Sequence, residues 1–124
     1  YYCGDPRDRW EHIVAAGADA VHFEESKKGF VIDIEEASRA VGPDVCLFGN
    51  VDAIALLDHG SDADLREELG RQFAVGKKRG GRFVMSVGSP VTPGASVKRV
   101  RDYVGFVREL NERDAADRAK TRKR

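Results

Sequence analysis

The sequence predicts an α/β fold in which parallel strands alternate with helices, forming the C-terminal half of a TIM-type (β/α)8 barrel. First, short apolar runs alternate with segments of helical periodicity through most of the 124 residues. Second, alternating units of this length favour parallel strands joined by right-handed crossovers. Third, four such units would leave two sheet edges open, and proteins normally pair or cover such edges. A small doubly wound sheet with helices on both faces is the alternative.

The first unit begins within a strand. Residues 1–3 are Tyr-Tyr-Cys and run into a Gly-Asp-Pro turn. Apolar side chains then recur at helical spacing over residues 8–16, before a glycine that is expected to end the helix. The next strand, over residues 18–23, is expected to end at the two acids Glu24 and Glu25.

The second and third units repeat this order. A helix is predicted over residues 32–41, and the continuous apolar run at 45–48 indicates a strand covered on both faces. Asp52 is expected to cap a short helical run that follows this strand. Ser61 or Asp62 is then expected to start a longer amphipathic helix.

The last unit contains a strand over residues 83–87 and a loop rich in Gly, Pro, Ser and Thr over 88–96. Apolar residues spaced by three and four positions from Val97 to Leu110 predict a helix packed on the sheet. The predicted half-barrel therefore spans residues 1–110. Residues 111–124 are expected to form a charged, disordered tail.

The composition narrows the classes of partner. The 21 basic and 21 acidic residues cancel, which gives no reason to expect nucleic acid or a membrane surface as a partner. Only two cysteines are present, and no apolar run reaches membrane-spanning length, so a cytoplasmic protein is expected. Because the first residue is tyrosine, we expect a missing segment upstream.

Polar residues gather where the predicted strands end. In a parallel sheet these ends lie on one rim, where side chains from separate segments can converge on a small-molecule substrate. The polarity of ordinary strand ends is the alternative explanation. The residues at this rim are Cys3, Asp5, Glu24, Glu25, Asn50, Asp52, Ser89 and Thr92.

The residue types suggest different roles. Asn50, Asp52 and Ser89 are the candidate catalytic residues, and the candidate substrate-binding residues are Glu24, Glu25, Gly88 and Thr92. Backbone N–H groups of the loop after Gly88, before a helix N-terminus, suit a carboxylate or phosphate, although a loop built only for tight turning is an equal alternative.

Two further kinds of site, a zinc site and a Ser-His-Asp triad, can be compared with the rim residues. Cys3 with Glu24 or Glu25 is a candidate zinc pair, but two ligands are too few. His22 is the only candidate third ligand, and its place within a strand favours a core histidine instead. No histidine is placed to activate Ser89, which argues against a Ser-His-Asp triad.

Four segments, in this order, resemble the C-terminal half of the uroporphyrinogen decarboxylase superfamily. They are residues 1–5 (YYCGD), the turn at 17–20 that leads to Glu24, residues 48–52 (FGNVD) and residues 85–93 (MSVGSPVTP). The resemblance extends to about Leu110. It implies an eight-fold barrel that is more than twice as long as this chain. The first half of that barrel is absent here.

The superfamily contains decarboxylases that need no cofactor and zinc-dependent methyltransferases that work with corrinoid proteins. In the methyltransferases, Cys3 would match one zinc-binding cysteine and Glu24 or Glu25 would lie near a glutamate ligand. Tyr1 and Ser89 stand where that branch has histidine and cysteine, and hydroxyl groups bind zinc less well. The decarboxylases carry a histidine at the position of Ser89.

The resemblance therefore implies first a uroporphyrinogen decarboxylase-like carboxy-lyase, which acts without a cofactor on a polycarboxylate such as a tetrapyrrole. A zinc- and corrinoid-linked methyltransferase is the alternative enzyme. The alternative without catalysis is a half-barrel assembly unit. In each case the open edges need a partner, either the missing N-terminal half-barrel or a second copy of the chain. The loop around Ser89 is expected to position substrate through its hydroxyls and backbone N–H groups.

Overall fold

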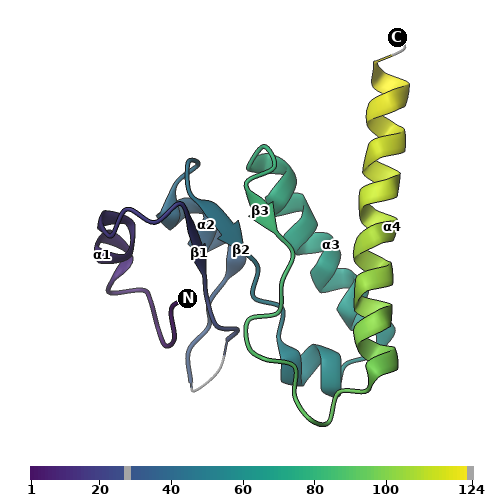
Figure 1. The fold of residues 1–124 in the computed structure, drawn as a ribbon, viewed down its shortest axis with the longest axis horizontal. Coiled ribbons are helices and arrows are strands. Elements are labelled where there is room, and N and C mark those ends of the chain that lie inside the picture. Colours follow the sequence, from purple (N-terminus) through teal and green to yellow (C-terminus); the bar gives the residue numbers. More distant parts are fainter. Residues whose placement is uncertain (27–28, 123–124) are drawn as a thin grey trace.

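The computed structural model describes residues 1–26 and 29–122, which form an α/β fold around a three-stranded parallel sheet (Figure 1). The strands β1 (Ala20–His22), β2 (Cys46–Phe48) and β3 (Phe83–Val84) pair in sequence order. A parallel bridge from Tyr2 to Phe23 places the first segment beside β1. The helices are α1 (Trp10–Ala15), α2 (Ile34–Val41), η1 (Ala53–Asp58), α3 (Asp62–Lys78) and α4 (Val97–Thr121).

The described elements confirm the predicted alternation of parallel strands and helices. Their order runs across the sheet without the reversal that marks the switch point of a doubly wound sheet. The strands are shorter than predicted. Beyond the ends of β2 and β3, the pairing of these two segments continues as an isolated bridge between Val51 and Val87.

The core lies in two clusters on the helical side of the sheet. In the first, Phe23 and Leu47 of the sheet pack with α2, and Trp10 of α1 meets the Phe23 ring edge-on at 5.1 Å. In the second, Leu65 and Leu69 of α3 pack with Phe106 of α4. Fully burying one such side chain contributes about 1.5–3 kcal/mol, so these contacts are what hold the short strands in place.

Side-chain caps set most of the helix starts. The predicted caps at Asp52 and Ser61 are confirmed, and Asp33 and Ser96 cap α2 and α4. The first helix differs from the prediction because it begins at Trp10, with no side-chain cap.

The helical run after β2 is a π-helix. The His59 N–H donates to the Ile54 carbonyl oxygen at 3.0 Å, five residues earlier. A Cβ on Gly60 would lie 2.8 Å from the Ala55 carbonyl oxygen, so the turn closes tightly at a glycine. π-Helices are rare and occur frequently at functional sites, and this one follows the carboxyl end of the central strand.

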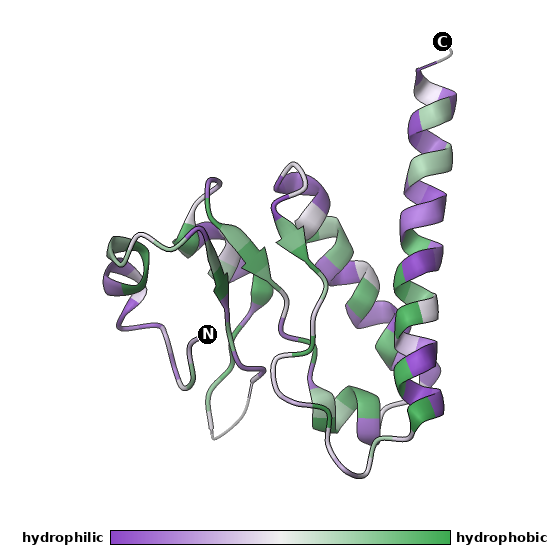
Figure 2. Cartoon of the chain, viewed as in Figure 1, coloured by the Kyte–Doolittle hydropathy of each residue, from purple (hydrophilic) through white to green (hydrophobic). Residues whose placement is uncertain are grey.

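The helix α4 is longer than the sequence predicts. Instead of a disordered tail from residue 111, the helix continues to Thr121. Its mostly hydrophilic outer end projects past α3 (Figure 2). Asp114 carries ion pairs to Lys77 of α3 and to Arg118 one turn on, each at 2.6 Å, which favour the extra turns. None of the described helices, α4 included, combines the length and apolar character needed to cross a membrane.

Replacing Tyr103 by phenylalanine is expected to leave stability unchanged or raise it by up to about 1 kcal/mol, since a buried polar group without a partner is costly. The Tyr103 hydroxyl is buried on α4 and has no hydrogen-bond partner within the described residues. Burial raises its pKa to about 12. The folded chain therefore holds this proton more tightly than the unfolded chain between pH 10 and 12, and wild-type stability should fall there as pH rises. Urea unfolding of the wild type and of Tyr103→Phe, at pH 7 and above pH 10, measures both effects.

A loss of 1 kcal/mol or more in Tyr103→Phe at pH 7 would reveal a hydrogen bond to the Tyr103 hydroxyl.

Candidate functional site

Three segments converge at the carboxyl ends of the strands. The Gly88 N–H donates to the Val51 carbonyl oxygen at 2.9 Å, which ties the segment after β3 to the segment after β2. Gly88 also lies directly on the segment after β1, because a Cβ there would stand 2.2 Å from the Glu25 backbone nitrogen. The loop carrying Ser89 can approach this closely only because residue 88 is glycine.

A first cluster joins the chain start to this loop. The Tyr1 hydroxyl donates to the Gly88 carbonyl oxygen at 2.7 Å and also interacts with the side chains of Cys3 and Ser89. Beside it, the Gly4 N–H donates to Glu24 Oε2 at 2.7 Å. The Glu24 side chain is only 5% exposed.

The Tyr1 phenol keeps its proton at neutral pH. Tyr1 is 66% exposed as a residue, yet partial desolvation of its hydroxyl is the main cause that raises its pKa. A hydrogen bond with Ser89 lowers the pKa, while Cys3 and the charge of Glu24 raise it further. The phenol therefore acts as a hydrogen-bond donor in this cluster.

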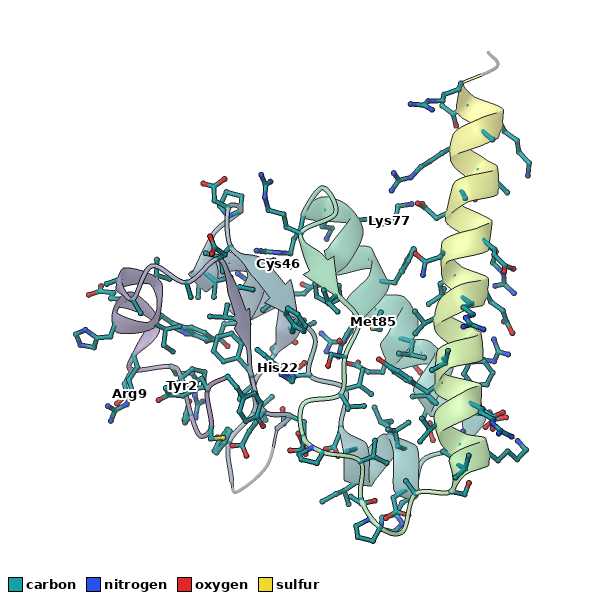
Figure 3. The ribbon with its side chains drawn as sticks, in the orientation of Figure 1. Tyr2, Arg9, His22, Cys46, Lys77 and Met85 are labelled. Atoms are coloured by element: carbon teal, nitrogen blue, oxygen red, sulfur yellow. The ribbon has the colours of Figure 1, made fainter. Side chains whose placement is uncertain are left out.

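His22 is a partly buried histidine with a backbone partner, as the sequence favours. Its Nε2 lies 2.9 Å from the Val87 carbonyl oxygen, which assigns the proton to that nitrogen. Its ring lies between those of Tyr1, at 4.8 Å, and Phe48, at 5.7 Å. In Figure 3, His22 is labelled between β1 and the segment after β3. His12 and His59 are exposed.

A second group lines a pocket of about 250 Å³ beside the first cluster. Three predicted site residues, Glu25, Asn50 and Asp52, line it, and sequence reasoning missed Arg71. The Arg71 guanidinium donates to Glu68 Oε2 and to Asp33 Oδ2, each at 2.8 Å. The other lining residues are Ser26, Ile32, Ala55, Leu56 and Glu68.

Asn50 and Asp52 differ in what they can still bind. Asn50 is 6% exposed, and its Nδ2 donates to the carbonyl oxygens of Ile32, at 2.8 Å, and Glu24, at 3.4 Å. Its Oδ1 accepts from Gln72 at 3.4 Å. Asp52 uses only Oδ1 to cap η1, and its Oδ2 makes no hydrogen bond within the described part of the chain. Asp52 is therefore the better placed of the two to meet a substrate.

Thr92 lies apart from both groups. Its hydroxyl donates to Asp58 Oδ2 at 2.9 Å, and a Cβ on Gly94 would stand 2.4 Å from the same oxygen. Asp58 thus holds the β3–α4 loop against η1. Arg99 donates nearby to the carbonyl oxygens at the end of this π-helix, those of Leu56, Gly60 and Ser61.

The residues of the first cluster do not fit a zinc ion. Cys3 and Glu24 supply two ligand types, whereas Tyr1 contributes a protonated phenol already bonded to Gly88. Within residues 1–26 and 29–122, no three His, Cys, Asp or Glu side chains lie where they could hold one metal ion. This cluster therefore supports no metal-dependent step.

Comparisons of this chain with known proteins point to one enzyme family. The family model of uroporphyrinogen decarboxylase (URO-D) matches residues 1–110. The chain is 33% identical over 101 residues to uroporphyrinogen decarboxylase of Hahella chejuensis (strain KCTC 2396), and 34% identical over 102 residues to that of Pseudomonas fluorescens (strain SBW25). Each alignment covers 82% of this chain and 26% of the relative, so the match spans about a quarter of each relative's length.

Proposed function

The chain belongs to the uroporphyrinogen decarboxylase family, and we propose that it forms part of a carboxy-lyase that acts on a polycarboxylate such as a tetrapyrrole. One observation carries the proposal. Within the matched residues 1–110, the chain start, the end of β1 and the loop after β3 converge at Gly88. This is the rim at which barrel enzymes place their active sites.

Curvature of the sheet supports the half-barrel. In a flat sheet the first and fourth strands would lie about 14 Å apart, three times the usual spacing of about 4.8 Å. The Tyr1 side chain on the first strand nevertheless reaches the Gly88 carbonyl oxygen just after the fourth, and a Cβ on Gly88 would stand 2.2 Å from the Glu25 backbone nitrogen after β1. These contacts favour a sheet that curves toward the face that carries Tyr1 and His22, as in a barrel.

The edge of β3 supports the need for a complementary half. A groove of about 400 Å³ lies beside this edge, and its walls include Phe83, Met85 and Val107. Helix α4 packs mainly on α3 and η1 instead of covering β3. We propose that a further strand fills this groove, from an N-terminal half-barrel or from a second copy of the chain.

The roles at the rim follow from the contacts. Decarboxylation breaks the bond between a carbon atom and its carboxyl group and releases carbon dioxide, and the electron pair left on that carbon takes up a proton from solvent. The substrate's carboxylates must therefore be held in place. Ser89 and the loop after Gly88 supply hydroxyl and N–H donors for a carboxylate. Asp52 offers Oδ2 to an N–H group of the substrate, with Glu25 in the same pocket and Glu24 beside it. Asn50 contributes by holding the backbone carbonyl groups of Glu24 and Ile32. Thr92 contributes by holding the β3–α4 loop against η1 through Asp58.

Replacing Asp52 by asparagine tests the proposal. Asparagine caps helices as well as aspartate does, so stability should change by less than about 0.5 kcal/mol. Turnover of uroporphyrinogen by a complete barrel should fall at least about tenfold, equivalent to about 1.4 kcal/mol of lost transition-state stabilisation. Mass spectrometry of the products measures turnover, and urea unfolding measures stability.

The matched control is Asp64→Asn, which changes the cap carboxylate of α3, outside the rim. It should leave turnover unchanged. Full turnover by the Asp52→Asn variant would remove Asp52 from the site. Stoichiometric zinc in the purified protein, lost on replacing Cys3, would favour the methyltransferase instead.

A further inference from the structure

We propose that Tyr1 and His22 are positioning residues, which fix the start of the β3–α4 loop so that Ser89 is held at the rim. The inference rests on the proposed function, because the role of Ser89 is part of it. Two successive carbonyl groups carry the argument. The Val87 oxygen lies 2.9 Å from His22 Nε2, and the Gly88 oxygen accepts from the Tyr1 hydroxyl at 2.7 Å.

The peptide group between Val87 and Gly88 is held from both sides. In a trans peptide the C=O and N–H point in opposite directions. Here the C=O meets His22 on β1, while the N–H donates to the Val51 carbonyl oxygen after β2 at 2.9 Å. This peptide therefore cannot rotate without breaking bonds to β1 and to the segment after β2.

The next peptide, between Gly88 and Ser89, is held by Tyr1. Glycine tolerates backbone angles that other residues avoid, so position 88 would otherwise be the free pivot of the loop. The Tyr1 bond fixes its carbonyl, and the Glu25 backbone leaves no space behind it. Both restraints together determine the direction in which the chain leaves toward Ser89.

The two donors also support each other. The Tyr1 and His22 rings lie 4.8 Å apart with their planes at 60°, and Phe48 contacts His22 from β2. Aromatic pairs in such tilted arrangements stabilise one another beyond the area that they bury. Removing one ring is therefore expected to loosen the other as well.

Misplacement of a substrate-holding group by about 1 Å can cost about 100-fold in rate. Replacing His22 by leucine should therefore lower kcat for uroporphyrinogen by 10- to 100-fold with little change in KM. Glutamine can place an N–H near the position of Nε2, so His22→Gln should recover most of kcat. Tyr1→Phe keeps the exposed ring and removes only the donor, and it should lower kcat in the same direction.

The test combines this kinetic comparison with amide hydrogen exchange of the Gly88 N–H in the same complete barrel, measured without substrate. We expect exchange at least about tenfold faster in His22→Leu and Tyr1→Phe than in the wild type, and near wild type in His22→Gln. Tyr2→Phe is the matched control, because among the described residues the Tyr2 hydroxyl bonds only the Asp5 carbonyl oxygen, at 3.4 Å.

The outcomes separate the two proposals. Unchanged exchange in both His22→Leu and Tyr1→Phe would overturn the positioning role, as would a His22→Gln variant no better than leucine. Faster exchange with a matching fall in kcat supports it. If the variants exchange faster but the wild-type protein does not turn over uroporphyrinogen, the loop restraint stands. The decarboxylase proposal, and with it the role of Ser89, would then be overturned.

Discussion

Replacing Arg79 by leucine is expected to destabilise the chain by about 3–5 kcal/mol, a large share of the 5–15 kcal/mol that typically stabilises a domain. Arg79 ends α3 and is 7% exposed. Its guanidinium donates to Ser38 Oγ and to four backbone carbonyl oxygens. Those carbonyls belong to Ser38, Gly42, Val45 and Arg82.

The expected loss follows from the acceptors that leucine would leave behind. An unsatisfied buried acceptor costs about 1–3 kcal/mol, and bonds to a charged donor are stronger than neutral ones. Burial lowers the pKa of Arg79, as desolvation does to a cation. Arginine still stays charged, and its five N–H groups match five acceptors, so no other residue type can replace it fully.

Urea unfolding measures this loss. Arg79→Lys should fall between wild type and Arg79→Leu, because an ammonium group has three donors instead of five. Arg39→Leu, an exposed change on neighbouring α2, is the matched control and should cost under about 0.5 kcal/mol. A loss below about 1 kcal/mol in Arg79→Leu would mean that water satisfies these carbonyls.

Replacing Gly88 by alanine is expected to destabilise the chain by about 1–3 kcal/mol or more, and to reduce turnover of a complete barrel beyond that loss. Overpacked cores typically lose this much. The added Cβ would stand 2.2 Å from the Glu25 backbone nitrogen and 2.8 Å from the Glu24 carbonyl carbon. Backbone atoms cannot rotate away, so the loop with Ser89 must move.

The matched control is Gly105→Ala in α4. A Cβ there would meet nothing within 4 Å, and alanine favours a helix interior over glycine by about 1 kcal/mol. This variant should therefore gain stability in the same urea experiment. A Gly88→Ala variant as stable and active as wild type would contradict the close packing of the loop on the segment after β1.

Features that depend on neighbouring residues could be predicted from the sequence. The caps at Asp52 and Ser61 are local, since each side chain bonds N–H groups two or three residues ahead. The strand at β2 was predictable because a continuous apolar run is typical of a strand covered on both faces. Convergence of the strand ends then followed from parallel pairing alone.

Features that depend on distant residues could not be predicted. Arg79 bonds residues as many as 41 positions away, and nothing in its local pattern separates it from an exposed arginine. The outer turns of α4 depend in the same way on Lys77 of another helix. The hydrogen bond from Gln72 to Asn50 spans 22 positions, so no local pattern could have indicated it.

The central claim is that this chain supplies one side of a decarboxylating rim. Incubating a complete barrel that contains the chain with uroporphyrinogen, and following the products by mass spectrometry, tests it most directly. We predict stepwise loss of carbon dioxide that Asp52→Asn slows at least about tenfold. An intact barrel that leaves uroporphyrinogen unchanged, and instead transfers a methyl group to a thiol, would contradict it.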